Sequence, residues 1–182
     1  MAAKGKTAAE KIRWTITPIP EGLALLARSS AGLRLVYLGQ DRGDLVSKLQ
    51  RDFAGTTLER DDVAFAQAAV VLSALAAGRP APGAKDLPLD VAGSDFQRQV
   101  WGALAQIPPG QTRSYGQIAA AIGHPGAARA VGSACAANPV PIIVPCHRAV
   151  ASDGSLGGYS GGLEIKRALL AAEGSPMAGA KA

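Results

Sequence analysis

Two residues with complementary chemistry, Cys146 and His147, follow directly on an apolar run of the sequence. The run contains Ile142, Ile143 and Val144, and these β-branched residues favour a buried strand. A cysteine reacts as its thiolate, and an adjacent histidine favours that form. The pattern therefore predicts a nucleophile presented at the end of a strand, an arrangement that suits proteases and redox sensors equally well.

The composition is typical of a small globular protein. The 182 residues suffice for one or two compact units, and 48% of them are hydrophobic whereas 18% are charged. No apolar run is long enough to span a bilayer and no signal peptide opens the chain, so a cytoplasmic location is predicted. Cys135 and Cys146 are expected to be free thiols in that reducing compartment. The net charge of +5 suits an anionic partner without identifying one.

Turn and linker residues divide the chain into two units. We predict a basic flexible tail over residues 1–12, a scaffold domain over 13–78, a linker over 79–93, a second domain over 94–174 and a flexible tail over 175–182. Short β-favouring runs in the first unit, at 13–17, 23–28 and 33–38, predict a small antiparallel sheet. Segments 41–53 and 63–77 carry apolar residues at helical spacing, Val70 among them, and predict two helices.

The second unit has the outline of a helix-turn-helix. Ser94 or Asp95 caps a first helix, and Ser114 opens the next. A tight turn at 123–126 then leads to a third helix over 127–137. A last helix over 163–172 ends before Gly174.

These elements predict an α/β fold class. A small N-terminal antiparallel sheet with helices precedes a C-terminal, mostly helical, winged-helix-like domain that carries the helix-turn-helix and the active-site Cys146.

Two further segments have more than one interpretation. The third helix consists almost entirely of small residues, with Arg129 as its only long charged side chain. Composition alone favours a thin helix packed against a neighbour, but such a helix would also enter a narrow groove of DNA with Arg129 as a wedge. The glycine-rich segment 149–162 is expected to be mobile. It is either a plain linker or a loop whose Tyr159 and Ser160 stack on and hydrogen-bond a planar ligand.

The sequence resembles the O6-alkylguanine-DNA alkyltransferases, also called methylated-DNA–protein-cysteine methyltransferases. The resemblance rests on blocks in family order: 96–101 (FQRQVW), 114–119 (SYGQIA), 129–132 (RAVG), 137–139 (ANP), 145–148 (PCHR) and 157–162 (GGYSGG). It covers residues 13–174, most densely in the second half, and it reverses the preference for simple packing at Arg129. The sequence departs from the family pattern at Ala149, where a valine is usual.

The resemblance implies a role for each matching residue. Cys146 corresponds to the alkyl acceptor, His147 to the base that acts on it through a bound water, and Glu173 to the carboxylate that orients the histidine. Tyr115 corresponds to the residue that assists protonation of the departing guanine and crowds the target phosphate. The remaining assignments are Arg129 in the gap left by a flipped nucleotide, Ser133 and Ala128 at the DNA, Tyr159, Ser160 and Ala149 at the base pocket, and Asn138 as a structural hinge.

The implied function is direct-reversal DNA repair. The alkyl group of O6-alkylguanine in duplex DNA would pass irreversibly to Cys146, once per molecule, by a monomer that enters the minor groove and flips the base. No cofactor and no metal are expected, because the first half lacks the cysteines and histidines that would bind zinc. Cys135 is expected to pack in the interior and His124 to lie at the surface of the turn.

Several alternatives stay open. The sequence does not reveal whether O4-alkylthymine is also a substrate or which alkyl size is preferred. A non-catalytic binder of alkylated DNA and a Cys-His thiol hydrolase remain as rival functions. Cys146 argues against the first of these, and the helix-turn-helix with Arg129 argues against the second.

Overall fold

A four-stranded sheet forms the centre of the first half. The computed structural model describes residues 11–180. Strands β1 (Lys11–Ile19), β2 (Gly22–Arg28) and β3 (Leu33–Gly39) run antiparallel as predicted, and β4 (Thr57–Arg60) pairs in parallel with β1 at the outer edge. The strand order is β3-β2-β1-β4. The sequence did not predict β4, and β1 begins two residues inside the predicted tail; residues 1–10 lie outside the described part of the chain.

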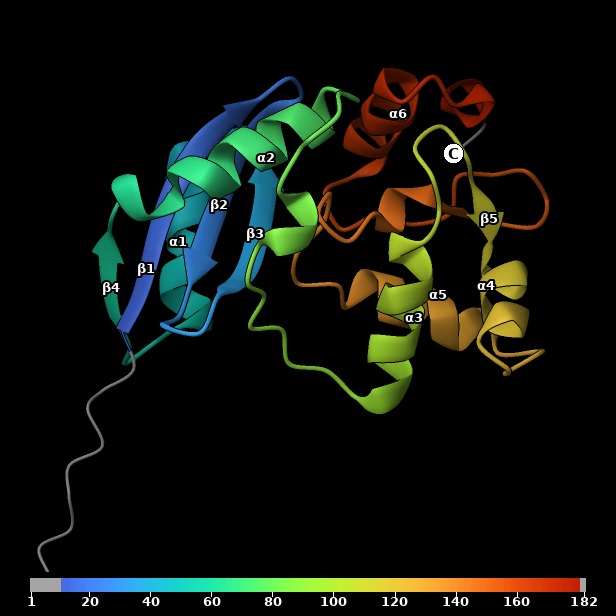
Figure 1. Cartoon of the computed structure of the whole chain (residues 1–182), viewed down its shortest axis with the longest axis horizontal. Coiled ribbons are helices and arrows are strands. Elements are labelled where there is room, and N and C mark those ends of the chain that lie inside the picture. The colour runs from blue at the N-terminus through green and yellow to red at the C-terminus, as the bar shows by residue number, and fades with distance from the viewer. Residues whose placement is uncertain (1–10, 181–182) are drawn as a thin grey trace, which may run out of the picture.

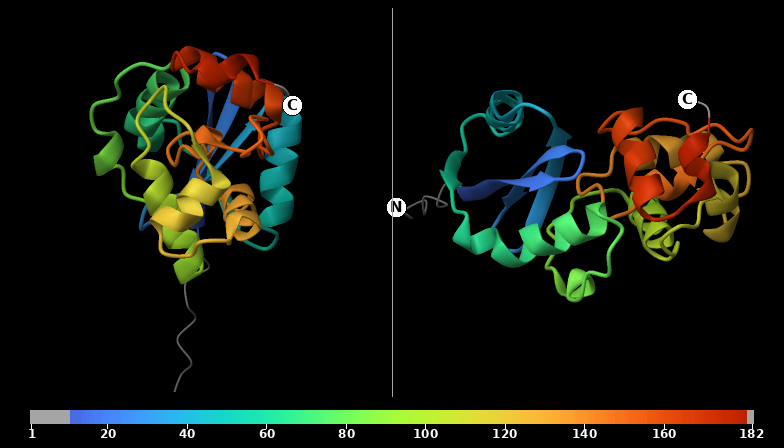
Figure 2. Two further views of the ribbon diagram at one scale, coloured as in Figure 1. Left: turned by 90° about the vertical axis from the view of Figure 1, so that its right-hand side faces the viewer. Right: turned by 90° about the horizontal axis from the view of Figure 1, so that it is seen from above.

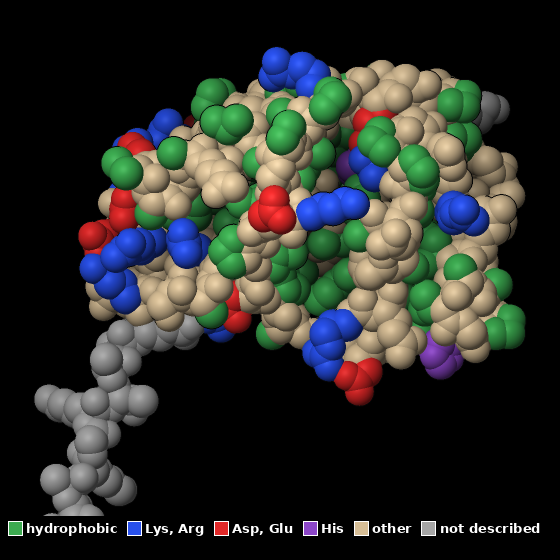
Figure 3. Space-filling model, in the orientation of Figure 1, with side chains coloured by type: hydrophobic (Ala, Val, Ile, Leu, Met, Phe, Trp, Pro, Cys, Tyr) green, Lys and Arg blue, Asp and Glu red, His purple; other side chains and the backbone are tan. Residues whose placement is uncertain are grey.

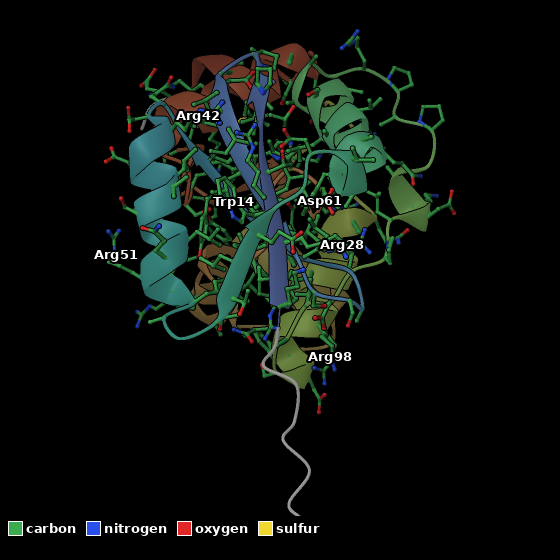
Figure 4. All side chains as sticks on the ribbon, turned by 90° about the vertical axis from the view of Figure 1, so that its left-hand side faces the viewer. Trp14, Arg28, Arg42, Arg51, Asp61 and Arg98 are labelled. Carbon is green, nitrogen blue, oxygen red and sulfur yellow. The ribbon has the colours of Figure 1, made fainter. Side chains whose placement is uncertain are left out.

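One helix covers each face of this sheet (Figure 1). Successive side chains of a strand point to opposite faces. Leu25 and Leu35 therefore pack with Leu49 of α1 (Arg42–Asp52), whereas Leu26 packs with Leu72 of α2 (Ala66–Ala76). Figure 4 views the outer end of the sheet, with α1 and α2 on opposite sides of the strands.

The two helices differ in how well the sequence predicts them. The Asp41 side chain accepts a hydrogen bond of 2.9 Å from the Asp44 N–H and begins α1 as expected. The predicted helix over 63–77 is instead a short 3-10 turn, η1 (Val63–Phe65), followed by α2. Val70 is 71% exposed because it lies two residues before Leu72, and residues two apart in a helix point to opposite sides.

The predicted linker is held against the sheet. It contains a 3-10 turn, η2 (Ala84–Asp86), and its next residues run beside β3. The Leu33 N–H donates to the Pro88 carbonyl at 2.7 Å, and the Asp90 N–H donates to the Leu33 carbonyl at 2.9 Å. These bonds satisfy backbone groups at the start of the edge strand β3, so the segment is not a free tether.

Three short helices in the second half include the predicted helix-turn-helix. They are α3 (Asp95–Ala105), α4 (Tyr115–Ala121) and α5 (Ala128–Ala136). Ser94 and Ser114 each form a capping box, in which the serine hydroxyl and a glutamine three residues later satisfy each other's backbone N–H. Two-residue strands β5 (Arg113–Ser114) and β6 (Ala149–Val150) pair in parallel beside them.

The C-terminal end differs from its prediction. Helix α6 (Leu163–Ala172) has the predicted bounds. Beyond it, the tail predicted to be flexible contains a 3-10 helix, η4 (Pro176–Gly179), which the buried Ser175 caps. Among residues 11–180, no helix is both long and apolar enough to cross a membrane.

The prediction of a strand directly before Cys146 is wrong. Residues 140–144 form a turn in which the Val144 N–H donates to the Val140 carbonyl at 3.0 Å. Ile142 adopts a φ of 73°, which a β-branched residue rarely does. Prolines at 139, 141 and 145 explain the outcome, because each lacks the N–H that a strand ladder requires.

The two halves share one apolar core. The cluster around Leu26 and Leu72 also contains Val140, Ile165 and Leu169 from the second half. The Val36 N–H of β3 donates to the Pro139 carbonyl at 2.7 Å, so the free edge of the sheet is covered by the segment that leads to the cysteine. Figure 2 shows the hairpin of β1 and β2 reaching toward the second half.

A close contact at Gly78 leads to a stability prediction. Gly78 has a φ of +63°, and a Cβ there would lie 2.0 Å from the Ala172 carbonyl oxygen at the end of α6. We expect Gly78→Ala to lower the free energy of unfolding by about 2 kcal/mol or more, since strain and overlap add. Urea denaturation measures this. Gly55→Ala is the control, because Gly55 has a similar φ of +82° and no atom within 4 Å of the added Cβ. Equal losses in both variants would contradict the predicted contact between the halves.

Candidate active site

A cavity of about 380 Å³ lies between α5, α4 and the glycine-rich loop. Its wall consists of Tyr115, Gly132, Cys135, Ala136, Cys146, Gly158, Tyr159 and Ser160. Four residues that the sequence assigned separately to chemistry and to base binding, Tyr115, Cys146, Tyr159 and Ser160, therefore share one space. Cys135 also lines it, whereas the sequence predicted only interior packing.

Asn138 holds Cys146 in place. Cys146 begins a 3-10 helix, η3 (Cys146–Arg148), directly after the turn. The Asn138 side-chain amide donates to the Val144 carbonyl at 2.9 Å and to Cys146 Sγ at 3.1 Å, while its oxygen accepts from the Val140 N–H at 3.1 Å. One buried side chain thus replaces the ladder that a strand would have supplied, and it connects the end of α5 to the thiol.

The environment of the Cys146 sulfur contains opposing influences on its ionisation. Burial raises the pKa of the thiol, because a charged thiolate is poorly solvated there. The hydrogen bond from Asn138 and the positive charge of Lys166 act in the opposite direction and lower that pKa. The resting thiol is therefore protonated at neutral pH, and its reaction requires a base.

His147 and Glu173 form a buried hydrogen-bonded pair. His147 Nε2 lies 2.9 Å from Glu173 Oε1, and the two side chains are 2% and 3% exposed. Burial lowers the pKa of His147, so the ring is neutral. Because the carboxylate can only accept, Nε2 carries the proton and Nδ1 presents its lone pair. Nδ1 is buried and has no hydrogen-bond partner within residues 11–180, which leaves it free to accept a proton.

Arg148 anchors Glu173, a role that the sequence analysis missed. Its Nε lies 3.1 Å from both carboxylate oxygens, and its Nη2 lies 2.6 Å from Oε1. Arg148 Nη1 donates to the Ile107 carbonyl at 2.5 Å, and the Gly110 N–H donates to Glu173 Oε2 at 3.2 Å. Burial alone would raise the pKa of Glu173, but the bonds from His147 and Arg148 lower it to about 2. The carboxylate is therefore ionised and fixed in orientation.

Lys166 is a second residue that the sequence analysis missed. It lies on the buried side of α6 and is 0% exposed. Its ammonium donates to the carbonyls of Ala149, at 2.6 Å, of Leu156, and of Gly158, at 3.4 Å. Burial lowers its pKa to about 8. The loop expected to be mobile is thus held by one side chain, and helical spacing to Leu169 and Leu170 would have predicted that Lys166 faces inward.

Two aromatic side chains, Tyr115 and Tyr159, line the cavity. A Cβ at Gly157, where φ is +67°, would lie 2.6 Å from the Tyr115 hydroxyl, so a glycine is needed for the loop to pass this close. Burial raises the pKa of Tyr115, which keeps the phenol protonated. The Tyr159 ring stands perpendicular to the His147 ring, with centroids 6.4 Å apart.

The outer face of α5 is exposed and nearly free of bulk. Arg129, Ala130 and Ser133 are exposed, whereas Val131, Ala134 and Cys135 are buried. Ala128 is half-buried at the start of the helix. Basic side chains do not gather in one patch on the face that Figure 3 shows but lie scattered over both halves. His124 is exposed in the turn, with its ring edge-on to Phe96 at 5.4 Å.

Ala149 is the assigned pocket residue that does not reach the cavity. It is fully buried, does not line the wall, and its carbonyl accepts from Lys166. Within residues 11–180, no group of three or more His, Cys, Asp or Glu side chains is arranged to hold a metal ion.

The hydrogen bonds of Asn138 lead to a prediction for Cys146. We expect Asn138→Ala to slow alkylation of Cys146 by at least about 10-fold, since it removes a donor to the sulfur worth roughly 1.5 kcal/mol or more. The substitution should also make the turn at 140–144 more mobile, because it removes the side-chain hydrogen bonds to Val140 and Val144. The rate of methyl incorporation measured by mass spectrometry checks this, with Gln50→Ala, an exposed amide on α1, as control. An unchanged rate would show that the amide does not position the thiol.

The ionised Glu173 leads to a prediction about the stability of the protein at acidic pH. Its pKa of about 2 lies below the ordinary value of 4.5, so its contribution to stability is present above pH 4.5 and is lost as the pH falls toward 2. The difference in unfolding free energy between the wild type and Glu173→Gln should shrink by about 3 kcal/mol between pH 6 and pH 2. Urea titrations at several pH values measure it. Glu164→Gln, on the exposed side of α6, should show no such trend.

The fold and the cavity together define a class of protein. It is a helix-turn-helix unit in which a slender exposed helix borders a pocket with a cysteine at its wall, and in which a buried histidine and glutamate lie beside that cysteine. Comparisons with known proteins narrow this class.

Residues 95–175 match the family model described as 6-O-methylguanine DNA methyltransferase, DNA binding domain. The methylated-DNA–protein-cysteine methyltransferase of Methanosarcina acetivorans is 41% identical over 162 residues, which cover 89% of this chain and 98% of the relative. The crystal structure of Mycobacterium tuberculosis OGT in complex with DNA matches with a TM-score of 0.72 and 42% identity, over 90% of this chain and 92% of that one. The chain belongs to the methylated-DNA–protein-cysteine methyltransferase family.

Other relatives are longer. The bifunctional transcriptional activator/DNA repair enzyme Ada of Escherichia coli is 44% identical over 162 residues, which cover 89% of this chain and 45% of the relative. The matched segments cover about half of the length of several of the curated relatives.

Proposed function

We propose that the protein repairs DNA by transferring the alkyl group of O6-alkylguanine to Cys146. The observation that supports this best is that the wall of one cavity contains Cys146 and also residues of α5, the second helix of the helix-turn-helix. A base flipped out beside α5 would therefore reach the thiol directly. A duplex lesion requires this route, since a stacked base hides its alkylated oxygen.

In the proposed reaction, His147 accepts the thiol proton at Nδ1 through a bound water while Glu173 holds Nε2–H. The Cys146 thiolate attacks the alkyl carbon, a carbon–sulfur bond forms, and the carbon–oxygen bond breaks with its electron pair left on the guanine. Tyr115, whose phenol is protonated, assists protonation of the departing base. The thioether product is stable, so each molecule acts once.

The proposed DNA complex uses the outer face of α5 in the minor groove. Exposed small residues there, with Ser133 and Ala128 among them, allow close approach, and Arg129 fills the space left by the flipped nucleotide. Tyr159 and Ser160 line the base pocket, while Asn138 joins α5 to the acceptor. Ala149 supports this pocket through the loop that Lys166 holds. We further propose that the protein acts as a monomer in the cytoplasm, without a cofactor.

Intact-mass measurement tests the proposal. The protein is incubated with duplex DNA that contains one O6-methylguanine, and the modified peptide is then mapped. We expect one methyl group per chain on Cys146 and none in Cys146→Ser, which should still bind the duplex. An unmodified wild type that prefers the lesion would favour a non-catalytic binder. Release of more than one equivalent of product would favour a hydrolase.

A further inference from the structure

Two free thiols line the same cavity. Cys135 comes from α5 and Cys146 from η3, and the two residues are 7% and 3% exposed. The proposed alkyl transfer uses only Cys146. The second thiol in the wall of the pocket is left without a role in that reaction.

One residue connects the two cysteines. The Asn138 N–H donates to the Cys135 carbonyl at 3.2 Å, and the Asn138 side-chain amide donates to Cys146 Sγ at 3.1 Å. Both cysteines also belong to one apolar cluster. Both residues contribute to the wall of one cavity.

We propose that Cys135 and Cys146 form a two-thiolate site for a soft divalent cation, of which Hg²⁺ is the type. Soft cations prefer thiolate sulfur, whereas hard cations require oxygen ligands, and no carboxylate lines this cavity. A two-coordinate cation holds its sulfurs on opposite sides. If its bonds to sulfur are as long as a Zn–S bond, about 2.3 Å, the two sulfurs lie about 4.6 Å apart. Two thiols in the wall of one cavity can bind such an ion without the direct sulfur–sulfur contact of a disulfide.

The charges of this complex balance. The cation displaces one proton from each thiol, two metal–sulfur bonds form, and two protons leave to solvent. The resulting complex is neutral, so an apolar cavity can hold it without an uncompensated buried charge. A tetrahedral ion would lack ligands, because residues 11–180 offer no cluster of three or more suitable side chains.

Binding of Hg²⁺ in competition with a small thiol tests the proposal. The probe is mercuric chloride added to the full chain without DNA, followed by 2-mercaptoethanol, with native mass spectrometry as readout. We expect one ion per chain. Removing it should require at least about 10²-fold more competitor for the wild type than for Cys135→Ser or Cys146→Ser, since the second thiolate binds intramolecularly.

A second measurement needs no variant. One equivalent of Hg²⁺ should protect both cysteines of the wild type from methyl methanethiosulfonate. Protection of one cysteine only, binding of two ions per chain, or equal retention in the wild type and a single variant would each overturn the two-thiolate site. These readouts do not depend on DNA. They therefore separate failure of this site from failure of the proposed alkyl transfer, on which only one consequence rests: the bound ion should block methylation of Cys146.

Discussion

Replacing Arg148 by methionine should lower the free energy of unfolding by about 3–5 kcal/mol and abolish methylation of Cys146. The Glu173 carboxylate is 3% exposed and takes three close contacts from Arg148, at 2.6 to 3.1 Å. Without the guanidinium, a buried charge loses most of its compensation, and the Ile107 carbonyl loses its donor. The carboxylate would then take up a proton or turn away, and His147 would lose its fixed tautomer.

Urea denaturation and the rate of methyl incorporation measure the two effects. Arg167→Met is the matched control, because Arg167 pairs with Glu164 at 2.8 Å on the exposed side of α6. Such a surface pair contributes about 1 kcal/mol or less. Similar losses in the two variants would mean that Arg148 is an ordinary surface charge and does not support the histidine.

Replacing Lys166 by methionine should have the second largest effect. Methionine fills similar space but leaves the carbonyls of Ala149, Leu156 and Gly158 without their donor. We expect the loop that carries Tyr159 and Ser160 to loosen, and methylation of Cys146 to slow by about 10-fold or more, because buried carbonyls without partners cost about 1–3 kcal/mol each. Hydrogen exchange of residues 149–160 and the methylation rate measure this result.

The stability of the same variant should depend on pH in a defined direction. The pKa of Lys166 falls from 10.5 to about 8 in the folded protein. Between these values the unfolded chain binds more protons than the folded one, so this group makes the wild type more stable as the pH rises from 8 to 10.5. Lys166→Met should lack that rise. Lys48→Met, at a half-exposed lysine of α1, should retain it. Two results would contradict the role given to Lys166. One is an increase in the stability of Lys166→Met between pH 8 and pH 10.5, and the other is a hydrogen-exchange rate in residues 149–160 of this variant that equals that of the wild type.

The helices were predictable because their signals are local. Asp41, Ser94 and Ser114 cap helices with their own side chains, and each cap acts within three residues. The bounds of α6 follow from apolar spacing and Gly174. The segment before Cys146 was predicted wrongly. Its β-branched residues favoured a strand, but three prolines in the same segment lack the N–H groups that a strand ladder requires. Val70 was misplaced because a residue two positions before the buried Leu72 points to the opposite side of the helix.

The sequence by itself determined which residues are available for chemistry. The adjacent Cys146 and His147, the small residues of α5 and the ordered family blocks all belong to local stretches, and together they indicated a DNA-binding unit with a reactive thiol. Only the tertiary structure decided how distant groups compensate one another. Glu173 is ionised because Arg148 and His147 meet it in the interior, and the loop of Tyr159 is held because Lys166 is buried beneath it. Burial makes each unpaired charge or carbonyl costly, so partners far apart in the chain are required, and local spacing does not show which partners the fold brings together.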